Sequence, residues 1–325
     1  MSGPDTPAIV VGADGSEIAL QAVVWAAVEA ALQHCALHIV TSYGVAPNPG
    51  LTAALAAAEQ QWLRADGERV LAEAAAVARH ATPDATPAIS TELSFDMIIP
   101  TLLEHSARAR MVVVGSHGRG AIGRMVLGSV STALSRHAHC PVAVVHGDPA
   151  ADAGWARKPV VVGVDGTANS VPAVELAFAE ASRRGAGLVA VHAWSDRSGY
   201  DLPVVGWEAI RETERVVLAE RLAGWAERFP EVSVERVVMC DSPVRALLAH
   251  CEDAQLLVVG THGRGGFPGL VLGSTSTALL HLAHCPTIVV RNGEADAAVT
   301  EHVTAGAKGS RMSAGSFRDD EGRGR

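Results

Sequence analysis

The sequence predicts an α/β protein of two tandem domains, each doubly wound around a five-stranded parallel sheet. The chain length, an internal repeat and a regular alternation of strand and helix patterns all support this fold class. A chain of 325 residues is long enough for two domains of about 150 residues, each with its own core. We expect an N-terminal domain over residues 1–148, a C-terminal domain over 156–292, and a disordered tail over 293–325, where a single aromatic residue accompanies Gly, Ser and mixed charges.

Three segments of the first half recur in the second half with few changes. The copies are 151 residues apart near the start and 145 residues apart further on, so the shift changes once, in the weakly similar middle. This pattern indicates a tandem duplication with a single change of length. The matched segments are IVVGADG (9–15) with VVVGVDG (160–166), VVVGSHGRG (112–120) with LVVGTHGRG (257–265), and AHCPVAVV (138–145) with AHCPTIVV (283–290).

Short apolar strands alternate with Ala- and Leu-rich helical stretches in each copy. The strands are rich in Val and Ile almost throughout, which is typical of strands buried on both faces. This alternation predicts right-handed crossovers and a parallel sheet that helices cover on both sides. In the first copy we expect strands near 8–13, 37–42, 88–93, 111–116 and 142–146, and helices near 16–33, 53–80, 97–108 and 128–138. In the second copy we expect strands near 159–164, 187–193, 232–239, 255–260 and 287–291.

The composition excludes several classes of protein. The chain carries 26 Lys and Arg against 35 Asp and Glu, a net charge of −9, whereas nucleic acid and anionic membranes require a basic surface. No apolar run approaches the roughly 18–20 residues that span a bilayer, and the first residues lack a basic segment followed by an apolar core. Five cysteines without a C-x-x-C pair are expected to be free thiols. A soluble, cytoplasmic protein is therefore predicted.

The candidate site lies beyond the carboxyl ends of the strands, where open parallel sheets bind ligands. One glycine-containing loop follows the first strand, and a second follows the fourth strand and leads into a helix. Glycines allow the backbone to approach a bulky anion, and the free N–H groups at the start of a helix favour phosphate. The loop residues are Gly12, Asp14, Gly115, Gly118, Gly128 and Ser129 in the first copy and Gly163, Asp165, Gly260, Gly263, Gly273 and Ser274 in the second.

Each of these residues also has a purely structural interpretation. Glycines after a strand are often turns, Ser before a helix is often an N-cap, and Asp14 and Asp165 are suited to cap the first helix of their copies. Their functional alternative is a hydrogen bond to a ribose or a base, or a metal contact. Both loops are retained in both copies while the intervening sequence has diverged, which favours the functional interpretation.

Other known motifs do not fit. No Lys precedes Ser129 or Ser274, which excludes a Walker loop, and the sequence has no G-x-S-x-G elbow of a serine hydrolase. The G-x-G-x-x-G match at 118–123 follows the fourth strand and is lost in the second copy, so a dinucleotide site is rejected. The segment HAHC (137–140) has altered spacing in the second copy and is interpreted as helix-end packing, not as a metal site.

The pattern G-x-D-G-[ST], then G-x2-G-x9-G-S, then a closing H-C-P strand resembles the universal stress protein family, in its ATP-binding subclass. The resemblance covers residues 7–146 and 157–292. It implies Rossmann-like sheets of strand order 3-2-1-4-5, with ATP and Mg²⁺ at the carboxyl edge and no catalytic residue. The implied nucleotide-binding residues of the first copy are Gly12, Asp14, Val40, Gly115, Ser116, His117, Gly118, Arg119, Gly120, Gly128 and Ser129. Those of the second copy are Gly163, Asp165, Val191, Asp196, Gly260, Thr261, His262, Gly263, Arg264, Gly265, Gly273, Ser274 and Thr275.

The resemblance implies a role for each group of residues. The aspartates and the first glycines would meet ribose and adenine, Val40 and Val191 would meet the base through their backbone, and the later loops would hold the phosphates. Asp196 is included from its position alone. Within each copy, the apolar closing strand is expected to lie at a sheet edge, and we expect strands 142–146 and 287–291 to bring the two copies together.

Three functions remain open from the sequence. The favoured one is a nucleotide-dependent regulator in the stress response, with two ATP sites per chain and a homodimeric state. The second is a slow ATPase or nucleotidyl-transfer enzyme, in which His117 and His262 orient water, with turnover at least roughly a hundredfold below the typical value of about 10 per second. The third is a dimeric scaffold without nucleotide, which the intact glycine pattern argues against.

Overall fold

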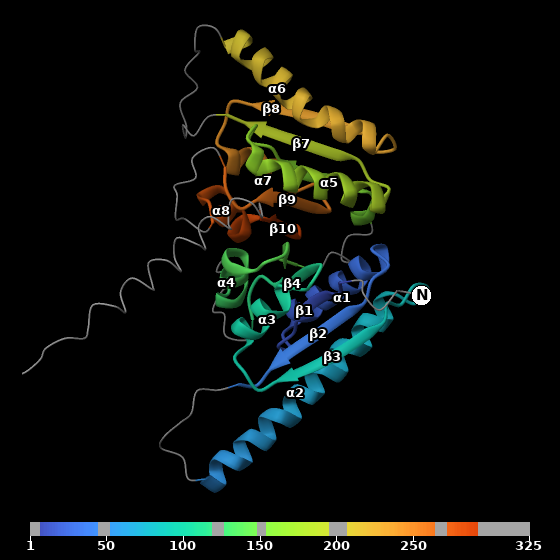
Figure 1. The fold of residues 1–325 in the computed structure, drawn as a ribbon, viewed down its shortest axis with the longest axis vertical. Coiled ribbons are helices and arrows are strands. Elements are labelled where there is room, and N and C mark those ends of the chain that lie inside the picture. The colour runs from blue at the N-terminus through green and yellow to red at the C-terminus, as the bar shows by residue number, and fades with distance from the viewer. Residues whose placement is uncertain are drawn as a thin grey trace, which may run out of the picture.

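The computed structural model describes residues 7–44, 53–118, 127–147, 154–194, 207–263 and 272–291. The predicted tail over 293–325 lies outside this part of the chain. In Figure 1 the two repeats lie one above the other, the first coloured blue to green and the second green to red. Strands and helices alternate in both, as predicted.

The first repeat contains β1 (Ile9–Gly12), α1 (Glu17–Leu32), β2 (Leu37–Ser42), α2 (Ala53–Ala81), β3 (Ile89–Ser94), α3 (Ile98–Ser106), β4 (Met111–Gly115), α4 (Ser129–His137) and β5 (Val142–Val145). A short 3-10 helix, η2 (Trp155–Arg157), precedes the second repeat. The second repeat contains β6 (Val160–Gly163), η3 (Ala168–Ser170), α5 (Val171–Arg184), β7 (Leu188–Ala193), α6 (Trp207–Arg228), β8 (Val234–Met239), α7 (Pro243–Cys251), β9 (Leu256–Gly260), α8 (Ser274–Leu282) and β10 (Thr287–Val290).

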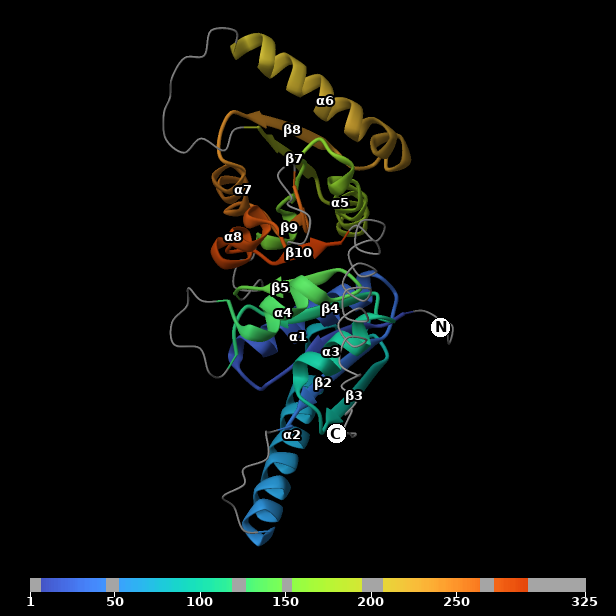
Figure 2. The same cartoon turned by 60° about the vertical axis from the view of Figure 1, so that its left-hand side comes forward.

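A single ten-stranded sheet runs through both repeats, in the order β3-β2-β1-β4-β5-β10-β9-β6-β7-β8. Within each repeat all neighbouring strands are parallel and the order is 3-2-1-4-5, which confirms the predicted fold class. The two closing strands, β5 and β10, pair with each other in antiparallel register, with Val142 opposite Val289. This pairing, visible in the middle of Figure 2, confirms that the closing strands join the repeats.

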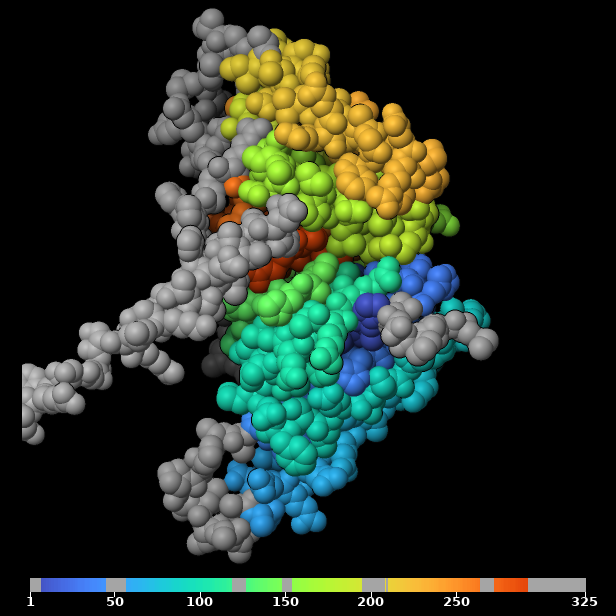
Figure 3. All heavy atoms as spheres, in the orientation of Figure 1, coloured from blue at the N-terminus to red at the C-terminus, as the bar shows by residue number. Residues whose placement is uncertain are grey.

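Helices cover both faces of this sheet and form two apolar cores. Residues of α1, α2, α5 and α6 pack on one face, and residues of α3, α4, α7 and α8 pack on the other. The central strands are buried on both sides, which explains why they are apolar throughout. The space-filling view in Figure 3 shows the surfaces of the two repeats in direct contact. In the part of the chain that the structure describes, no helix is long and apolar enough to cross a membrane.

The cysteines of the HAHC segment and of its copy are buried packing residues, whereas its histidines, His137 and His139, are exposed, which corrects the packing interpretation for these two side chains. All five cysteines are free, and Cys140 and Cys285 are buried, as expected from their positions before Pro141 and Pro286. Burial raises the pKa of the Cys140 thiol to about 12, so this thiol stays protonated and unreactive at neutral pH.

Charged side chains are buried where the two repeats meet. Glu29 on α1 and Glu180 on α5 occupy equivalent positions of the repeats, and each side chain is at most 1% exposed. Arg184 forms an ion pair with Glu29 across the junction, and its Nε lies 3.1 Å from Oε2 of Glu180. Gln33, which is equivalent to Arg184, donates from Nε2 to Oε1 of Glu180 at 3.4 Å. The duplication has therefore placed equivalent positions side by side in one buried polar network.

The two carboxyl groups of this network differ in acidity. Burial and the neighbouring Glu180 carboxylate raise the pKa of Glu29 to about 7. Burial also acts to raise the pKa of Glu180, but the charges of Arg184 and Arg183 outweigh it and the pKa is lowered. The network therefore gains a proton at Glu29 near neutral pH.

Glu29→Gln should make the junction less sensitive to pH. The pKa of Glu29 is higher in the folded state, about 7, than its ordinary value of 4.5. The protonated carboxyl group therefore stabilises the fold fully below pH 4.5, and this contribution to the free energy of unfolding is lost as the pH rises to about 7. Between pH 5 and pH 8 the free energy of unfolding should therefore fall by about 2–3 kcal/mol more in the wild type than in the Gln variant. Urea unfolding at both pH values measures this difference. The same change at the exposed Glu220 is the control, and a parallel profile for both variants would contradict the expectation.

Candidate functional site

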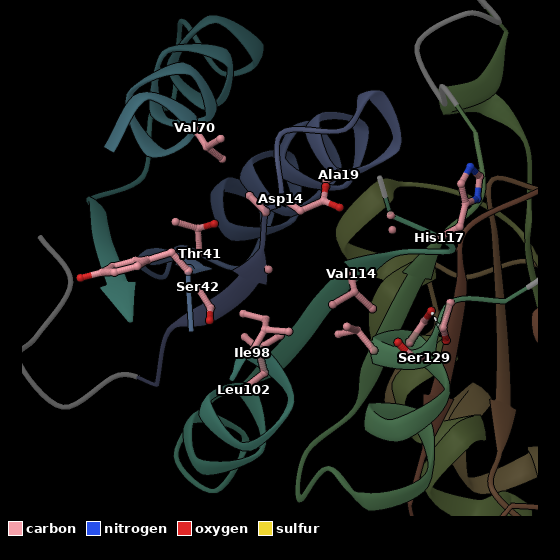
Figure 4. A pocket seen from close by; sticks show the side chains of 18 of the residues that line it. Asp14, Ala19, Thr41, Ser42, Val70, Ile98, Leu102, Val114, His117 and Ser129 are labelled. Carbon is pink, nitrogen blue, oxygen red and sulfur yellow. Dashed lines mark hydrogen bonds between the residues drawn. The ribbon is translucent and has the colours of Figure 1, made fainter. Parts of the chain in front are cut away.

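A cavity of about 800 Å³ opens at the carboxyl ends of β1, β2 and β4 in the first repeat. Helices α2, α3 and α4 complete its wall. In Figure 4 Ile98, Leu102 and Val114 gather along one side, and Asp14 lies across the cavity from Leu102. The predicted site residues that line the cavity are Gly12, Asp14, Gly115, His117, Gly118, Gly128 and Ser129.

The loop after β1 holds the Asp14 carboxylate in a fixed position. Oδ1 of Asp14 accepts hydrogen bonds from Ser16 N at 2.9 Å and from Ser16 Oγ at 2.6 Å. Between them Gly15 adopts a φ of +75°, in the left-handed region that favours glycine. The cap of α1 is Ser16 itself, whose Oγ accepts from Ala19 N at 3.3 Å. Asp14 therefore does not cap the helix directly, and its carboxylate lies at the cavity wall.

The loop after β4 leads into a helix whose start has no side-chain cap. Gly128 is the N-cap residue of α4, and its N–H donates to the Ser116 carbonyl at 2.7 Å. Oγ of Ser131 donates to the same carbonyl at 3.0 Å. A Cβ at Gly128 would lie 3.2 Å from His117 Cα, so any other residue would push these two segments apart by a few tenths of an ångström. Because no side chain caps α4, the N–H groups of its first turn are available to an anion in the cavity.

The two loops meet at Gly118. A Cβ built on Gly118 would lie only 2.5 Å from Oδ2 of Asp14. The carboxylate cannot simply turn away, because its other oxygen is held by Ser16. A side chain at this position is therefore disfavoured by the contact with Asp14, and not by the backbone, because the φ of Gly118 lies outside the left-handed region.

Part of the cavity wall could not be predicted from the sequence. Thr41, Ser42 and Tyr43, at the end of β2, line it, as do one face of α2 and one face of α3. These helix residues have no motif of their own, and their only signal is the amphipathic spacing that any packed helix shows. They are Leu63, Asp66, Gly67, Val70, Ile98 and Leu102. Among the described lining residues there is no Lys or Arg, and Asp66 pairs with Arg69 at 2.6 Å.

The structure does not bring Val40 to the cavity wall. The carbonyl of Val40 accepts a hydrogen bond from Ala13 N at 2.9 Å, and its side chain is fully buried. In the second repeat the carbonyl of Val191 accepts in the same way from Val164 N at 2.9 Å. The next residue on the strand, Thr41, lines the cavity instead. Ser116 lies behind the wall, where its hydroxyl is 3.0 Å from Nδ1 of His117. Arg119, Gly120, Asp196, Arg264 and Gly265 lie outside the described residues.

The second repeat has the same main hydrogen bonds in its two loops. Oδ1 of Asp165 accepts from Thr167 N at 2.8 Å, and Gly166 has a φ of +78°. Gly273 is the N-cap of α8 and donates to the Thr261 carbonyl at 2.7 Å. The remaining predicted residues take equivalent places at the ends of β6 and β9 and at the start of α8, namely Gly163, Gly260, His262, Gly263, Ser274 and Thr275.

The two repeats differ at the end of the second strand. His192 stands at the position of Thr41 and is fully buried. Its Nδ1 lies 2.7 Å from the Val164 carbonyl, and its Nε2 lies 2.7 Å from Oε2 of Glu214 on α6. A hydroxyl group in one repeat is therefore replaced in the other by a buried imidazole paired with a partly exposed carboxylate, so the two candidate sites are not chemically identical.

Comparisons with known proteins agree with this architecture. The model of the universal stress protein family matches residues 7–146 and 156–291. The chain is 45% identical over 286 residues to universal stress protein Rv2005c of Mycobacterium tuberculosis, covering 87% of this chain and 96% of the relative. It is 40% identical over 291 residues to universal stress protein Rv2623 of the same species, covering 89% and 98%. The crystal structure of a universal stress protein from Archaeoglobus fulgidus has the same fold, with a TM-score of 0.62, 20% identity, and coverage of 87% of this chain and 98% of that one. The chain, with its two copies of the domain, belongs to the universal stress protein family.

Proposed function

We propose that this protein binds ATP at the carboxyl edge of each repeat and acts as a nucleotide-dependent regulator. The observation that carries the proposal is the cavity in which Asp14, Gly118 and the uncapped start of α4 converge. Its volume of about 800 Å³ falls within the range of about 300–1,000 Å³ that is typical of small-molecule sites.

Each part of the cavity suits a part of ATP. The first-turn N–H groups of α4, together with the Ser129 hydroxyl, provide donors for phosphate oxygens. The Asp14 carboxylate is an acceptor for ribose hydroxyls or a ligand for Mg²⁺. The apolar wall formed by Ile98, Leu102 and Val114 is suited to the face of a purine ring.

The described part of the site favours binding over rapid turnover. Fast phosphoryl transfer needs positive charge, a metal and a group that positions water. No Lys or Arg is among the described lining residues, and His117 has Ser116 as its hydrogen-bond neighbour instead of a carboxylate. ATP then acts as a ligand that shifts the population of conformations through its differential affinity for them.

Titration of ATP into nucleotide-free protein tests this function. Calorimetry in the presence of magnesium should show two ATP molecules bound per chain, and their affinities should differ because Thr41 in one site corresponds to His192 in the other. Phosphate release from the same sample should stay below about 0.1 per second, roughly a hundredfold under a typical enzyme. Absence of ATP binding would favour a scaffold, and turnover near one per second that is lost in His117→Ala or His262→Ala would identify an ATPase.

A homodimer stays a prediction from the family resemblance. The closing strands β5 and β10 pair with each other within one chain. They are therefore not available to join two chains, and a homodimer would have to use another surface.

A further inference from the structure

Three side chains that the proposed nucleotide site does not use converge beside the edge strand β3. They are His38 on β2, Glu92 on β3 and His105 on α3, and their ligand atoms all lie within 4.8 Å of one another. Oε2 of Glu92 is 3.1 Å from Nε2 of His38 and 3.2 Å from Nε2 of His105. Among the described residues this is the one group of three or more His, Cys, Asp or Glu side chains with such a convergence. It lies one helical turn beyond Leu102, outside the cavity wall.

The distances within this cluster suit a tetrahedral metal ion. Bonds of about 2.0–2.1 Å from a tetrahedral ion to nitrogen and oxygen ligands place neighbouring ligand atoms about 3.3 Å apart. The two measured distances from the Glu92 oxygen, 3.1 and 3.2 Å, are close to that value. Two imidazoles with one carboxylate are ligands that Zn²⁺ and similar ions prefer. The side chains are 20–38% exposed, which leaves an entry path and room for a water ligand.

Ser90 orients His38 in the way that a metal ligand requires. Its hydroxyl donates to the Leu37 carbonyl at 3.5 Å, and its oxygen lies 2.8 Å from Nδ1 of His38. In the tautomer in which the Nδ1–H donates to this oxygen, the lone pair of Nε2 is directed at the Glu92 carboxylate, as metal binding requires. In that tautomer a metal ion between the lone pair and the carboxylate replaces the proton that otherwise joins them. Hydrogen bonds of this kind to the outer nitrogen are typical of metal-bound histidines.

The second repeat lacks the cluster and serves as an internal comparison. Strand register places Val189 at the position of His38 and Val237 at the position of Glu92. Only His105 has a like counterpart, His250, whose Nδ1 lies 2.9 Å from the Ala246 carbonyl. Apolar residues thus suffice for the fold at two of the three positions, so folding alone does not require this polar set.

From these contacts we propose that His38, Glu92 and His105 bind a divalent transition-metal ion of the Zn²⁺ class, with water at the remaining coordination position. The site belongs to the first repeat alone. It ties the edge strand β3 to β2 and to α3, and it is independent of nucleotide binding.

Metal titration of the full chain tests the proposal. The protein carries Cys240→Ser, which removes the exposed thiol, and is dialysed against chelator, without nucleotide or phosphate, before ZnSO₄ or CoCl₂ is added. Calorimetry should show one Zn²⁺ per chain, and Co²⁺ should produce the visible absorption of a tetrahedral complex. Ser90→Ala should weaken Zn²⁺ binding about tenfold, as loss of an outer hydrogen bond does. Glu92→Gln and His105→Ala should weaken it by more than about a hundredfold and abolish the cobalt bands.

Two further variants distinguish loss of ligands from loss of fold. His250→Ala, in the second repeat, should leave Zn²⁺ affinity and the cobalt spectrum unchanged. The double variant His38→Val/Glu92→Val copies the residues of the second repeat and should unfold at the temperature of the metal-free protein, yet gain no thermal stability from ZnSO₄. Absence of Zn²⁺ binding to the Cys240→Ser protein, or unchanged affinity in His105→Ala, would overturn the proposal and leave the cluster as hydrogen-bonded side chains.

Discussion

Gly118→Ala should strongly weaken ATP binding at the site of the first repeat, whereas Gly263→Ala should leave the site of the second repeat in place. The two glycines are equivalent in the repeat, but their surroundings differ. A Cβ at Gly118 would lie 2.5 Å from Oδ2 of Asp14, while a Cβ at Gly263 would lie 3.8 Å from Oδ2 of Asp165, an ordinary contact. A single methyl group therefore displaces the carboxylate in one repeat and is accommodated in the other.

The expected effect follows from the loss of the Asp14 hydrogen bond. Loss of a hydrogen bond to a charged partner costs about 1.5–3 kcal/mol, which corresponds to roughly 10- to 100-fold weaker ATP binding at the first site. Calorimetry should then show one strong site in Gly118→Ala and two in Gly263→Ala, with thermal unfolding as a check that both variants are folded. The larger Gly118→Val and Gly263→Val changes should each remove one site. Two strong sites of unchanged affinity in Gly118→Ala would disprove the assignment of Asp14 and Gly118 to nucleotide binding.

Arg184→Ala should lower the free energy of unfolding by about 3 kcal/mol. Arg184 is 4% exposed, pairs with both Glu29 and Glu180, and lies over the Trp25 ring at 5.8 Å from its centroid. Its removal leaves the buried Glu29 without a cation and Glu180 with Arg183 alone. Loss of a buried partner of this kind is far more destabilising than the loss of a surface pair. Chemical denaturation at pH 7 measures the loss.

Two comparisons isolate the role of the buried network. Arg64→Ala removes an ion pair with Glu68 in which both side chains are about 60% exposed, and it should cost less than about 0.5 kcal/mol. In a Glu29→Gln background, Arg184→Ala should cost less than in the wild type, because one of the two carboxyl groups is already neutral. An equal, small loss for Arg184→Ala and Arg64→Ala would show that the junction does not depend on this network.

The strand and helix pattern and the loop chemistry were predictable because they depend on local sequence. Apolar Val-rich strands, the repeat spacing and the glycine loops indicated two doubly wound repeats, and the resemblance added the strand order that the sheet shows. Gly15 and Ser16 likewise act through neighbours two or three residues away, in the turn and the helix cap. The Asp14 carboxylate was correctly placed near the glycine loops, although its contact with Gly118 was not foreseen.

By itself, then, the sequence determined the duplication, the order of elements along the chain and the loops that gather at the carboxyl edge. Only the tertiary structure decided which helix faces enter the cavity, that Thr41 and not Val40 lines it, and that Glu29 meets Arg184 across the junction. It also brought His38, Glu92 and His105 together from three elements. Their separations along the chain match no motif, because packing of strands and helices, and not local spacing, sets the distance between residues on different elements.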